Sequence, residues 1–66
     1  MLGTVRFFST EKGYGFIAPD EGTRDVFVHV RTAEASGIEL REGQRLAFDT
    51  FETTKGLKAA NLRLAR

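Results

Sequence analysis

The sequence predicts a small all-β domain in which five short antiparallel strands close into a barrel. Apolar and polar residues alternate with a period of two in several windows, and no window sustains the spacing of an amphipathic helix. Turn-forming residues separate these windows. Because a flat sheet made from 66 residues would leave open edges and bury little apolar surface, one barrel-shaped domain is expected over residues 1–66.

The first three strands are expected in the N-terminal half. Residues 5–9 and 14–18 are rich in aromatic and β-branched side chains, and the turn signal at residues 10–13 joins them into a hairpin. A second turn signal, with proline first and glycine last, occupies residues 19–22. It leads into a third strand over residues 25–30.

The second half of the chain begins with a long connection. Over residues 31–43 the alternation is lost, and Thr32 is expected to cap one helical turn that Gly37 ends. The alternation resumes at residues 46–51 and again at 59–64, with a glycine-containing turn between them. These two segments are the expected fourth and fifth strands.

Strand parity predicts the core, because alternate side chains of a strand face opposite sides of the sheet. Val26, Val28 and Val30 share one face of the third strand, and Ile17 lies on the matching face of the second. These four side chains are expected to point inward. The other expected core residues are Leu46, Phe48, Ala60, Leu62 and Leu64.

The opposite face of the second and third strands carries rings. Tyr14, Phe16, Phe27 and His29 would form a contiguous exposed patch, and monomeric proteins rarely expose such a patch without a use for it. Parity fails at β-bulges, so the alternative is that one or two of these rings belong to the core.

The first strand offers two candidates for a further ring. Strict parity places Phe7 on the face of Val5, and Phe8 on the face of Arg6. The strand must therefore bulge if Phe7 is to join the exposed patch, and both phenylalanines stay open as candidates.

Composition excludes several classes of protein. The absence of cysteine excludes a disulfide scaffold, a zinc ribbon and a thiol nucleophile, and it fits a reducing compartment, so a cytoplasmic location is expected. Apolar runs of two or three residues exclude a membrane span, and no basic leader precedes them. The net charge is only +1, yet residues 20–52 are mainly acidic, whereas residues 55–66 are basic.

Catalytic chemistry finds no support in the sequence. Residues 13–18 fit a loose dinucleotide-binding pattern, but that pattern must open a helix, and here Pro19 and a strand follow. His29 is the only histidine, and Asp25 on the same face lies about 13 Å away along an extended strand. We therefore expect no enzymatic activity, no metal, no cofactor and no small-molecule substrate.

Two motifs resemble the paired ribonucleoprotein-type motifs of bacterial cold-shock proteins. They are Lys12-Gly13-Tyr14-Gly15-Phe16-Ile17 and Val26-Phe27-Val28-His29. Residues 6–8, 40–44 and 59–62 also match this family in order, so the resemblance covers nearly the whole chain.

The resemblance implies an oligonucleotide-binding (OB-fold) barrel that stacks the bases of single-stranded RNA and DNA on aromatic side chains. It also implies a monomer that acts as an RNA chaperone or transcription antiterminator in the cold-shock response. The binding residues carried over are Arg6, Phe7, Lys12, Tyr14, Phe16, Phe27, His29 and Lys55, with Phe8, Asp25, Val30, Arg31, Ile38 and Lys58 as further candidates. Elementary chemistry agrees, because every base has a π-face and basic groups hold the backbone. Gly13 and Gly15 are expected to leave the backbone open, so that a base can approach closely.

The chain departs from the family pattern at four positions. Phe7 replaces a tryptophan, Val30 replaces a phenylalanine, and Ile38 stands where phenylalanine is common. Leu57 replaces a proline. The stacking area is therefore smaller, and a lower affinity is expected.

A different class of partner is a proline-rich peptide, which small barrels can bind in aromatic grooves. The basic residues around the rings favour phosphate instead. They are Arg6, Lys12, Arg31, Lys55 and Lys58.

Overall fold

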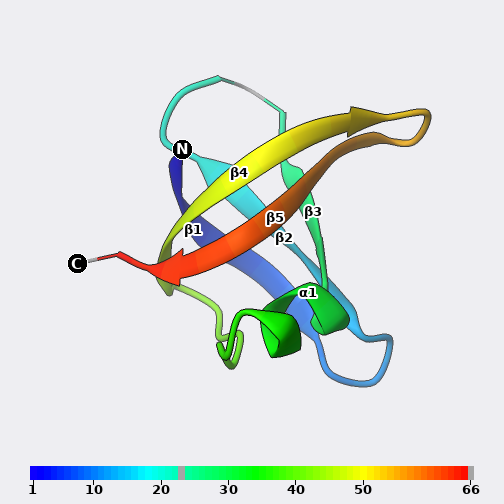
Figure 1. Cartoon of the computed structure of the whole chain (residues 1–66), viewed down its shortest axis with the longest axis vertical. Helices are drawn as coiled ribbons and strands as arrows, with labels where there is room; N and C mark the ends of the chain where they lie inside the picture. Colours follow the sequence, from blue (N-terminus) through cyan, green and yellow to red (C-terminus); the bar gives the residue numbers. More distant parts are fainter. Residues whose placement is uncertain (23, 66) are drawn as a thin grey trace.

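The computed structural model describes residues 1–22 and 24–65, which form a closed five-stranded barrel with one short helix (Figure 1). Arg66, counted above in the basic end of the sequence, lies outside the described residues. The elements are β1 (Leu2–Ser9), β2 (Tyr14–Pro19), β3 (Val26–His29), α1 (Val30–Ala35), β4 (Arg45–Thr53) and β5 (Gly56–Leu64). The order around the ring is β1-β2-β3-β5-β4, and β4 pairs back onto β1. The predicted all-β barrel is confirmed.

The barrel is antiparallel at every pairing except one. β1 pairs antiparallel with β2 and β4, and the β2–β3 and β4–β5 pairs are antiparallel as well. The pair of β3 with β5 is parallel and is registered at Phe27 and Lys58. Strand directions cannot alternate all the way around a ring of five, so one parallel pair is unavoidable in a closed barrel of this size.

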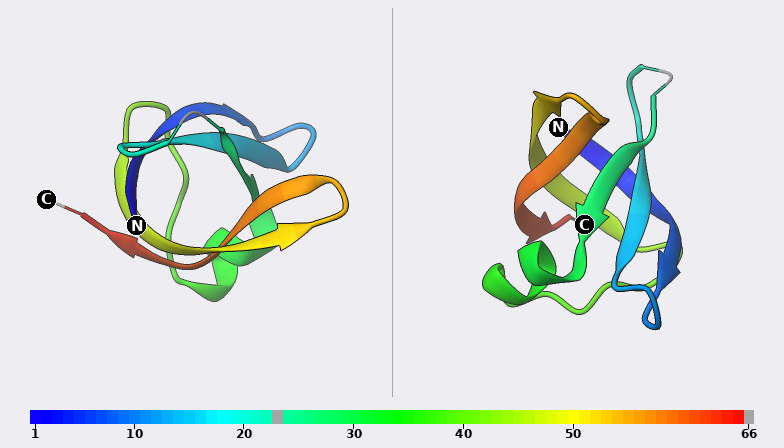
Figure 2. Two further views of the ribbon diagram at one scale, coloured as in Figure 1. Left: turned by 90° about the horizontal axis from the view of Figure 1, so that it is seen from above. Right: turned by 90° about the vertical axis from the view of Figure 1, so that its right-hand side faces the viewer.

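Views from two further sides show what lies outside the ring. Seen from above, the strands enclose the core, and the hairpin of β4 and β5 projects beyond them (Figure 2, left). The helix α1 lies across one end of the barrel (Figure 2, right). Within residues 1–22 and 24–65, no helix is long and apolar enough to cross a membrane.

The start of α1 corrects two predictions. β3 ends at His29, and Val30 begins the helix instead of continuing the strand. His29 is the N-cap, because its Nδ1 accepts a hydrogen bond from the Arg31 backbone N–H at 3.1 Å, whereas Thr32 lies inside the helix. A histidine ring nitrogen can thus do what was expected of the threonine hydroxyl. Gly37, with φ +72°, follows the helix as predicted.

Strand parity predicts most of the core correctly. Val26, Val28 and Ile17 are fully buried. Leu46 and Phe48 from β4 and Leu62 from β5 are buried against them. The rings of β2 and β3 accordingly point outward. The alternative, that one or two of them belong to the core, is wrong.

The parity prediction fails in β5, where a bulge inserts one residue. Asn61 has φ +52°, and the register with β4 shifts opposite it. The bulge reverses the faces before it, so Ala59 is buried in place of Ala60. Leu64, also expected in the core, is 66% exposed because it is the last residue of the strand, where the chain leaves the barrel (Figure 1).

Candidate nucleic-acid interface

One row of paired residues crosses all five strands on the outside of the barrel. Phe7 of β1 pairs with Phe16 of β2, which pairs with Phe27 of β3. Phe27 pairs with Lys58 of β5, and Lys58 pairs with Phe51 of β4. Directly paired residues of neighbouring strands project from the same face of a sheet. The outer surface therefore carries an aromatic row that consists of four phenylalanines and one lysine.

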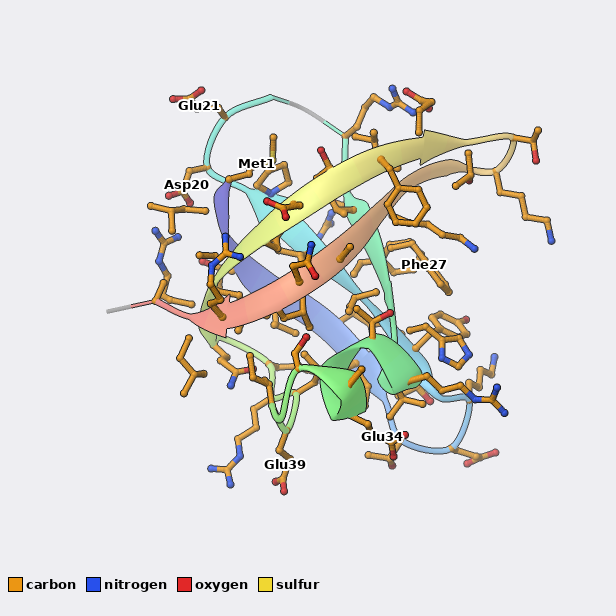
Figure 3. The ribbon with its side chains drawn as sticks, in the orientation of Figure 1. Met1, Asp20, Glu21, Phe27, Glu34 and Glu39 are labelled. Atoms are coloured by element: carbon orange, nitrogen blue, oxygen red, sulfur yellow. The ribbon has the colours of Figure 1, made fainter. Side chains whose placement is uncertain are left out.

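Five rings on β1, β2 and β3 contact one another and form an aromatic platform. Tyr14 lies near its centre, with its ring centroid 5.4 Å from Phe27, 6.0 Å from Phe16 and 6.2 Å from Phe7. His29 extends the cluster, 6.5 Å from Phe27. Figure 3 shows the Phe27 side chain pointing away from the barrel. The structure thus brings together all five predicted ring residues: Phe7, Tyr14, Phe16, Phe27 and His29.

A bulge in β1 decides between the two adjacent phenylalanines. The register with β2 shifts between Val5 and Phe7, as the sequence required for Phe7 to face outward. Phe7 is 43% exposed and belongs to the platform. Phe8 packs against the core.

Gly15 serves the fold, and the expectation that it opens the backbone to a base is wrong, whereas for the partly exposed Gly13 that expectation stays a prediction. A Cβ built on Gly15 would overlap the carbonyl oxygen of Phe7. The side on which another residue would carry its Cβ is therefore filled by the backbone of β1, and Gly15 is buried. Gly13 has φ +76° in the turn between β1 and β2, and a Cβ there would lie 3.3 Å from Val30 Cγ1.

A groove of about 610 Å³ runs beside the platform. One wall consists of Tyr14, Phe16 and Phe27, and the connection between β2 and β3 adds Arg24 and Asp25. The β4–β5 hairpin supplies the other wall. Its lining residues are Thr53, Lys55, Gly56, Leu57 and Lys58.

Two lysines give this groove its positive charge. Lys58 Nζ lies 5.5 Å from the centroid of Phe27, within the range of a cation–π contact. Lys55 is exposed in the turn of the hairpin. Both were predicted, and both line the groove from the β4–β5 hairpin.

Arg24 also lines the groove, and its place there was not predicted from the sequence. Its guanidinium donates two hydrogen bonds to the carboxylate of Glu52, at 2.8 and 3.3 Å. These bonds hold the pKa of Glu52 below its usual value and raise the pKa of Arg24. The available signal was its position two residues before the second motif, next to Asp25.

Arg6 and Asp25 form a second ion pair beside the platform. Arg6 Nη1 donates to Asp25 Oδ2 at 2.8 Å, which joins β1 to the residue that precedes β3. The partner of the Asp25 carboxylate is thus Arg6, whereas His29 Nδ1 accepts its hydrogen bond from the Arg31 backbone N–H. The two residues are therefore not arranged as a catalytic pair. Within residues 1–22 and 24–65, no group of three metal-ligating side chains is present either.

The remaining predicted residues lie away from the platform groove. Phe8, Val30 and Ile38 line a second groove of about 460 Å³, whose lining also includes the carboxylate side chains Glu34 and Glu39. The structure thus separates three of the expected binding residues from the main site.

Lys12 and Arg31 occupy two other places. Lys12 is exposed in the turn between β1 and β2, where its backbone N–H donates to Ser9 Oγ at 3.1 Å. Arg31 is on α1, in a shallow hollow that it shares with Asn61 of β5. Neither residue lines the platform groove.

A small closed β-barrel that exposes contiguous rings beside a lysine-lined groove has the features of an oligonucleotide-binding barrel. Comparison with known proteins identifies the family. The sequence profile of the 'Cold-shock' DNA-binding domain matches residues 1–65, and the chain belongs to this family. The predicted resemblance is confirmed, and so is the prediction of a nucleic-acid-binding domain that is not an enzyme.

Curated relatives match over almost their whole length. The chain is 50% identical to the major cold shock protein of Micrococcus luteus over 62 residues, which are 92% of each chain. It is 47% identical to a cold shock protein of Rhizobium meliloti over 66 residues, 96% of each chain. It is also 46% identical to a cold shock-like protein of Aquifex aeolicus over 63 residues, 94% of this chain and 90% of the relative.

Proposed function

We propose that this protein binds single-stranded RNA and DNA with little sequence preference, by stacking bases on the aromatic platform. The observation that carries the proposal is the contiguity of the rings of Phe7, Tyr14, Phe16, Phe27 and His29, directly beside a groove with two lysines. Every base offers a π-face, so stacking tolerates any sequence. A duplex hides those faces, so selectivity for single strands follows from the same chemistry.

The phosphates are held by the basic groups around the platform. Lys55, Lys58 and Arg24 line the groove, and Arg6 and Lys12 lie on the side of β1 and its turn. Arg24 has a carboxylate partner in the free protein, and a phosphate offers the guanidinium the same two-pronged geometry. Binding therefore exchanges one anion for another at Arg24. A base that stacks on Phe27 takes the place of the Lys58 ammonium, which lies over that ring in the free protein.

The second groove has a smaller part in binding. Phe8, Val30 and Ile38 offer one partly buried ring and two aliphatic side chains to a base. Glu34 and Glu39 beside them repel phosphate. Arg31, which follows Val30 on α1, is the basic residue next to this groove in the sequence.

The biological role that fits this chemistry is that of a cytoplasmic, monomeric RNA chaperone or antiterminator that acts when cold stabilises base pairing. The platform can reach only unpaired bases. Binding therefore shifts the equilibrium from helix to single strand by mass action, without a chemical fuel. The names of the relatives, which are cold shock proteins, support this role.

A titration that uses the intrinsic fluorescence of the chain tests the proposal. Tyr14 is the only tyrosine and the chain has no tryptophan, so this fluorescence reports directly from the centre of the platform. Oligothymidine should quench it, and a DNA duplex of equal length should bind far more weakly. Equal affinity for both would rule out stacking, and tighter binding of a proline-rich peptide would assign the groove to peptides instead.

A further inference from the structure

The aromatic row continues past the platform groove to Phe51 on β4. Phe7 and Phe51 end this row on opposite sides, and they are the two phenylalanines that the described chain leaves exposed, at 43% and 50%. Phe51 is the last residue of the fourth strand that the sequence predicts, and the alternation there assigns it no function. A single exposed apolar residue is ordinary. Phe51, however, belongs to a row of paired residues in which every member except Lys58 is a phenylalanine.

Lys58 connects Phe51 to the platform. It is the direct strand partner of Phe27 on one side and of Phe51 on the other. Neighbouring strands lie about 4.8 Å apart, so the backbones at Phe27 and Phe51 are about 10 Å apart, with the backbone of Lys58 between them and its Nζ over the Phe27 ring. A single strand that stacks bases on both rings must cross Lys58, whose ammonium group can pair with a phosphate on that path.

The core does not explain the position of Phe51. Its neighbour Thr50 is on the inward side of β4, opposite the buried Ala59, so Phe51 projects outward with Lys58. The carboxylate of Asp49 projects from the same face, but it accepts a hydrogen bond from Asn61 Nδ2 at 2.9 Å. Its charge is therefore partly satisfied within the protein.

We propose that Phe51 is an additional base-stacking residue, which extends the path of a bound single strand across Lys58 onto β4. This inference rests on the proposed function. The occupant is a base of the same strand whose other bases lie on the platform. A second copy of the chain is the weaker candidate, because one ring buries about 150–250 Å² and a stable interface needs on the order of 1,200 Å².

The extension makes a prediction about strand length. A strand of about 4 nucleotides can fill the platform without reaching β4, whereas one of about 12 nucleotides reaches both. We expect Phe51→Ala to weaken binding of the longer oligothymidine by about 5- to 20-fold and to leave the shorter one unchanged, as measured by quenching of Tyr14. Phe51→Leu keeps apolar area but loses the π-face. Its affinity for the longer oligothymidine should therefore lie between that of the parent protein and that of Phe51→Ala.

Two variants serve as controls. Leu64→Ala removes another exposed apolar side chain, at the far end of β5, and should change neither affinity. Phe16→Ala removes a platform ring and should weaken the binding of both oligothymidine lengths. A loss with Phe16→Ala but none with Phe51→Ala would overturn the extension and leave the proposed function standing, whereas no loss with either variant would overturn both.

Two further outcomes would also overturn the extension. An equal loss for both lengths with Phe51→Ala would show that Phe51 acts by supporting Lys58 and the platform. A change in sedimentation behaviour with protein concentration that Phe51→Ala abolishes would assign the residue to self-association. Urea unfolding of each variant identifies any loss that comes from destabilisation.

Discussion

Gly15 of β2 lies against the backbone of Phe7 in β1, at the point where β1 bulges. A Cβ on Gly15 would overlap the Phe7 carbonyl oxygen and lie 3.0 Å from Phe8 Cα. Neither atom can move aside as the end of a flexible side chain could. The bulge that turns Phe7 toward the platform is therefore possible only because residue 15 has no side chain.

We expect Gly15→Ala to destabilise the barrel by about 1–3 kcal/mol or more, and to lower affinity by displacing Phe7. Urea unfolding measures the first effect, and oligothymidine titration of the folded fraction measures the second. Gly43→Ala is the matched control: residue 43 has φ +84° with open space around it, so it loses only about 1–2 kcal/mol of backbone preference. If the two variants were equally stable, the close approach at Gly15 would be irrelevant.

Period-two patterning predicted the strands and the platform because both depend on local alternation. It placed Phe16 and Phe27 outward and Val28 inward, as the structure does. It also predicted that β1 must bulge if Phe7 is to join the platform, but it could not choose between Phe7 and Phe8, and the observed bulge makes that choice.

The errors fall where the backbone departs from a repeating pattern. Asparagine adopts positive φ more readily than most residues, but one asparagine in an alternating run does not by itself predict a bulge, so Ala60 was expected inside. Val30 has the β-branched side chain of a strand residue, yet the cap made by His29 starts a helix there. Arg24 is in an irregular connection, so only the three-dimensional arrangement brings it to the groove.

Removal of a platform ring should affect binding more than folding. Phe27→Ala deletes a half-buried ring that contacts Tyr14 and Phe16, so single-strand affinity should fall by about 1–3 kcal/mol. Phe8→Ala is the converse case, because Phe8 packs against the core, and it should cost about 2–4 kcal/mol of stability. Titration and urea unfolding of both variants separate the two effects. A Phe27→Ala protein that unfolds easily but binds normally would assign that ring to the core.

The charge of the groove should be visible in the salt dependence of binding. If three or four basic side chains contact phosphates, the log–log slope of affinity against salt should be roughly −2 to −3 for a single strand. Lys55→Gln should weaken binding evenly across sequences and reduce the magnitude of that slope by about 0.7. Arg41→Gln, an equal charge change in a connection that does not line the groove, should leave the slope unchanged. No salt dependence at all would favour a peptide ligand.

Glu52 is expected to restrain Arg24 in the free protein. Glu52→Gln removes the charge that competes with phosphate for the guanidinium, so single-strand affinity should rise by about two- to fivefold at low salt. Glu42→Gln makes the same change of net charge in the connection before β4 and should have a smaller effect. In an Arg24→Gln background the gain from Glu52→Gln should shrink to that of Glu42→Gln. An undiminished gain would mean that Arg24 does not bind phosphate.

The ion pair of Asp20 with Arg45 should make stability depend on pH at the acid end. Arg45 donates hydrogen bonds of 2.6 and 2.7 Å to the two carboxylate oxygens of Asp20, which ties the turn after β2 to the start of β4. These bonds lower the pKa of Asp20 from its usual 3.8. The folded protein therefore binds this proton less readily than the unfolded chain does, so the contribution is present above pH 3.8 and disappears as the pH falls through the lower, folded value.

Asp20→Asn should accordingly be less stable than the parent protein at about pH 7, and the difference should shrink at about pH 2, because the contribution of the ion pair is lost as the pH falls below 3.8 through the lower, folded value. Urea midpoints at the two pH values measure this difference. The pKa of Glu52 is lowered in the same direction, but both proteins share that contribution and it cancels in the comparison. Glu21→Gln makes the same change of net charge at the neighbouring exposed carboxylate and is the matched control. A difference that persisted unchanged at about pH 2 would mean that Asp20 stabilises the turn by means other than its charge.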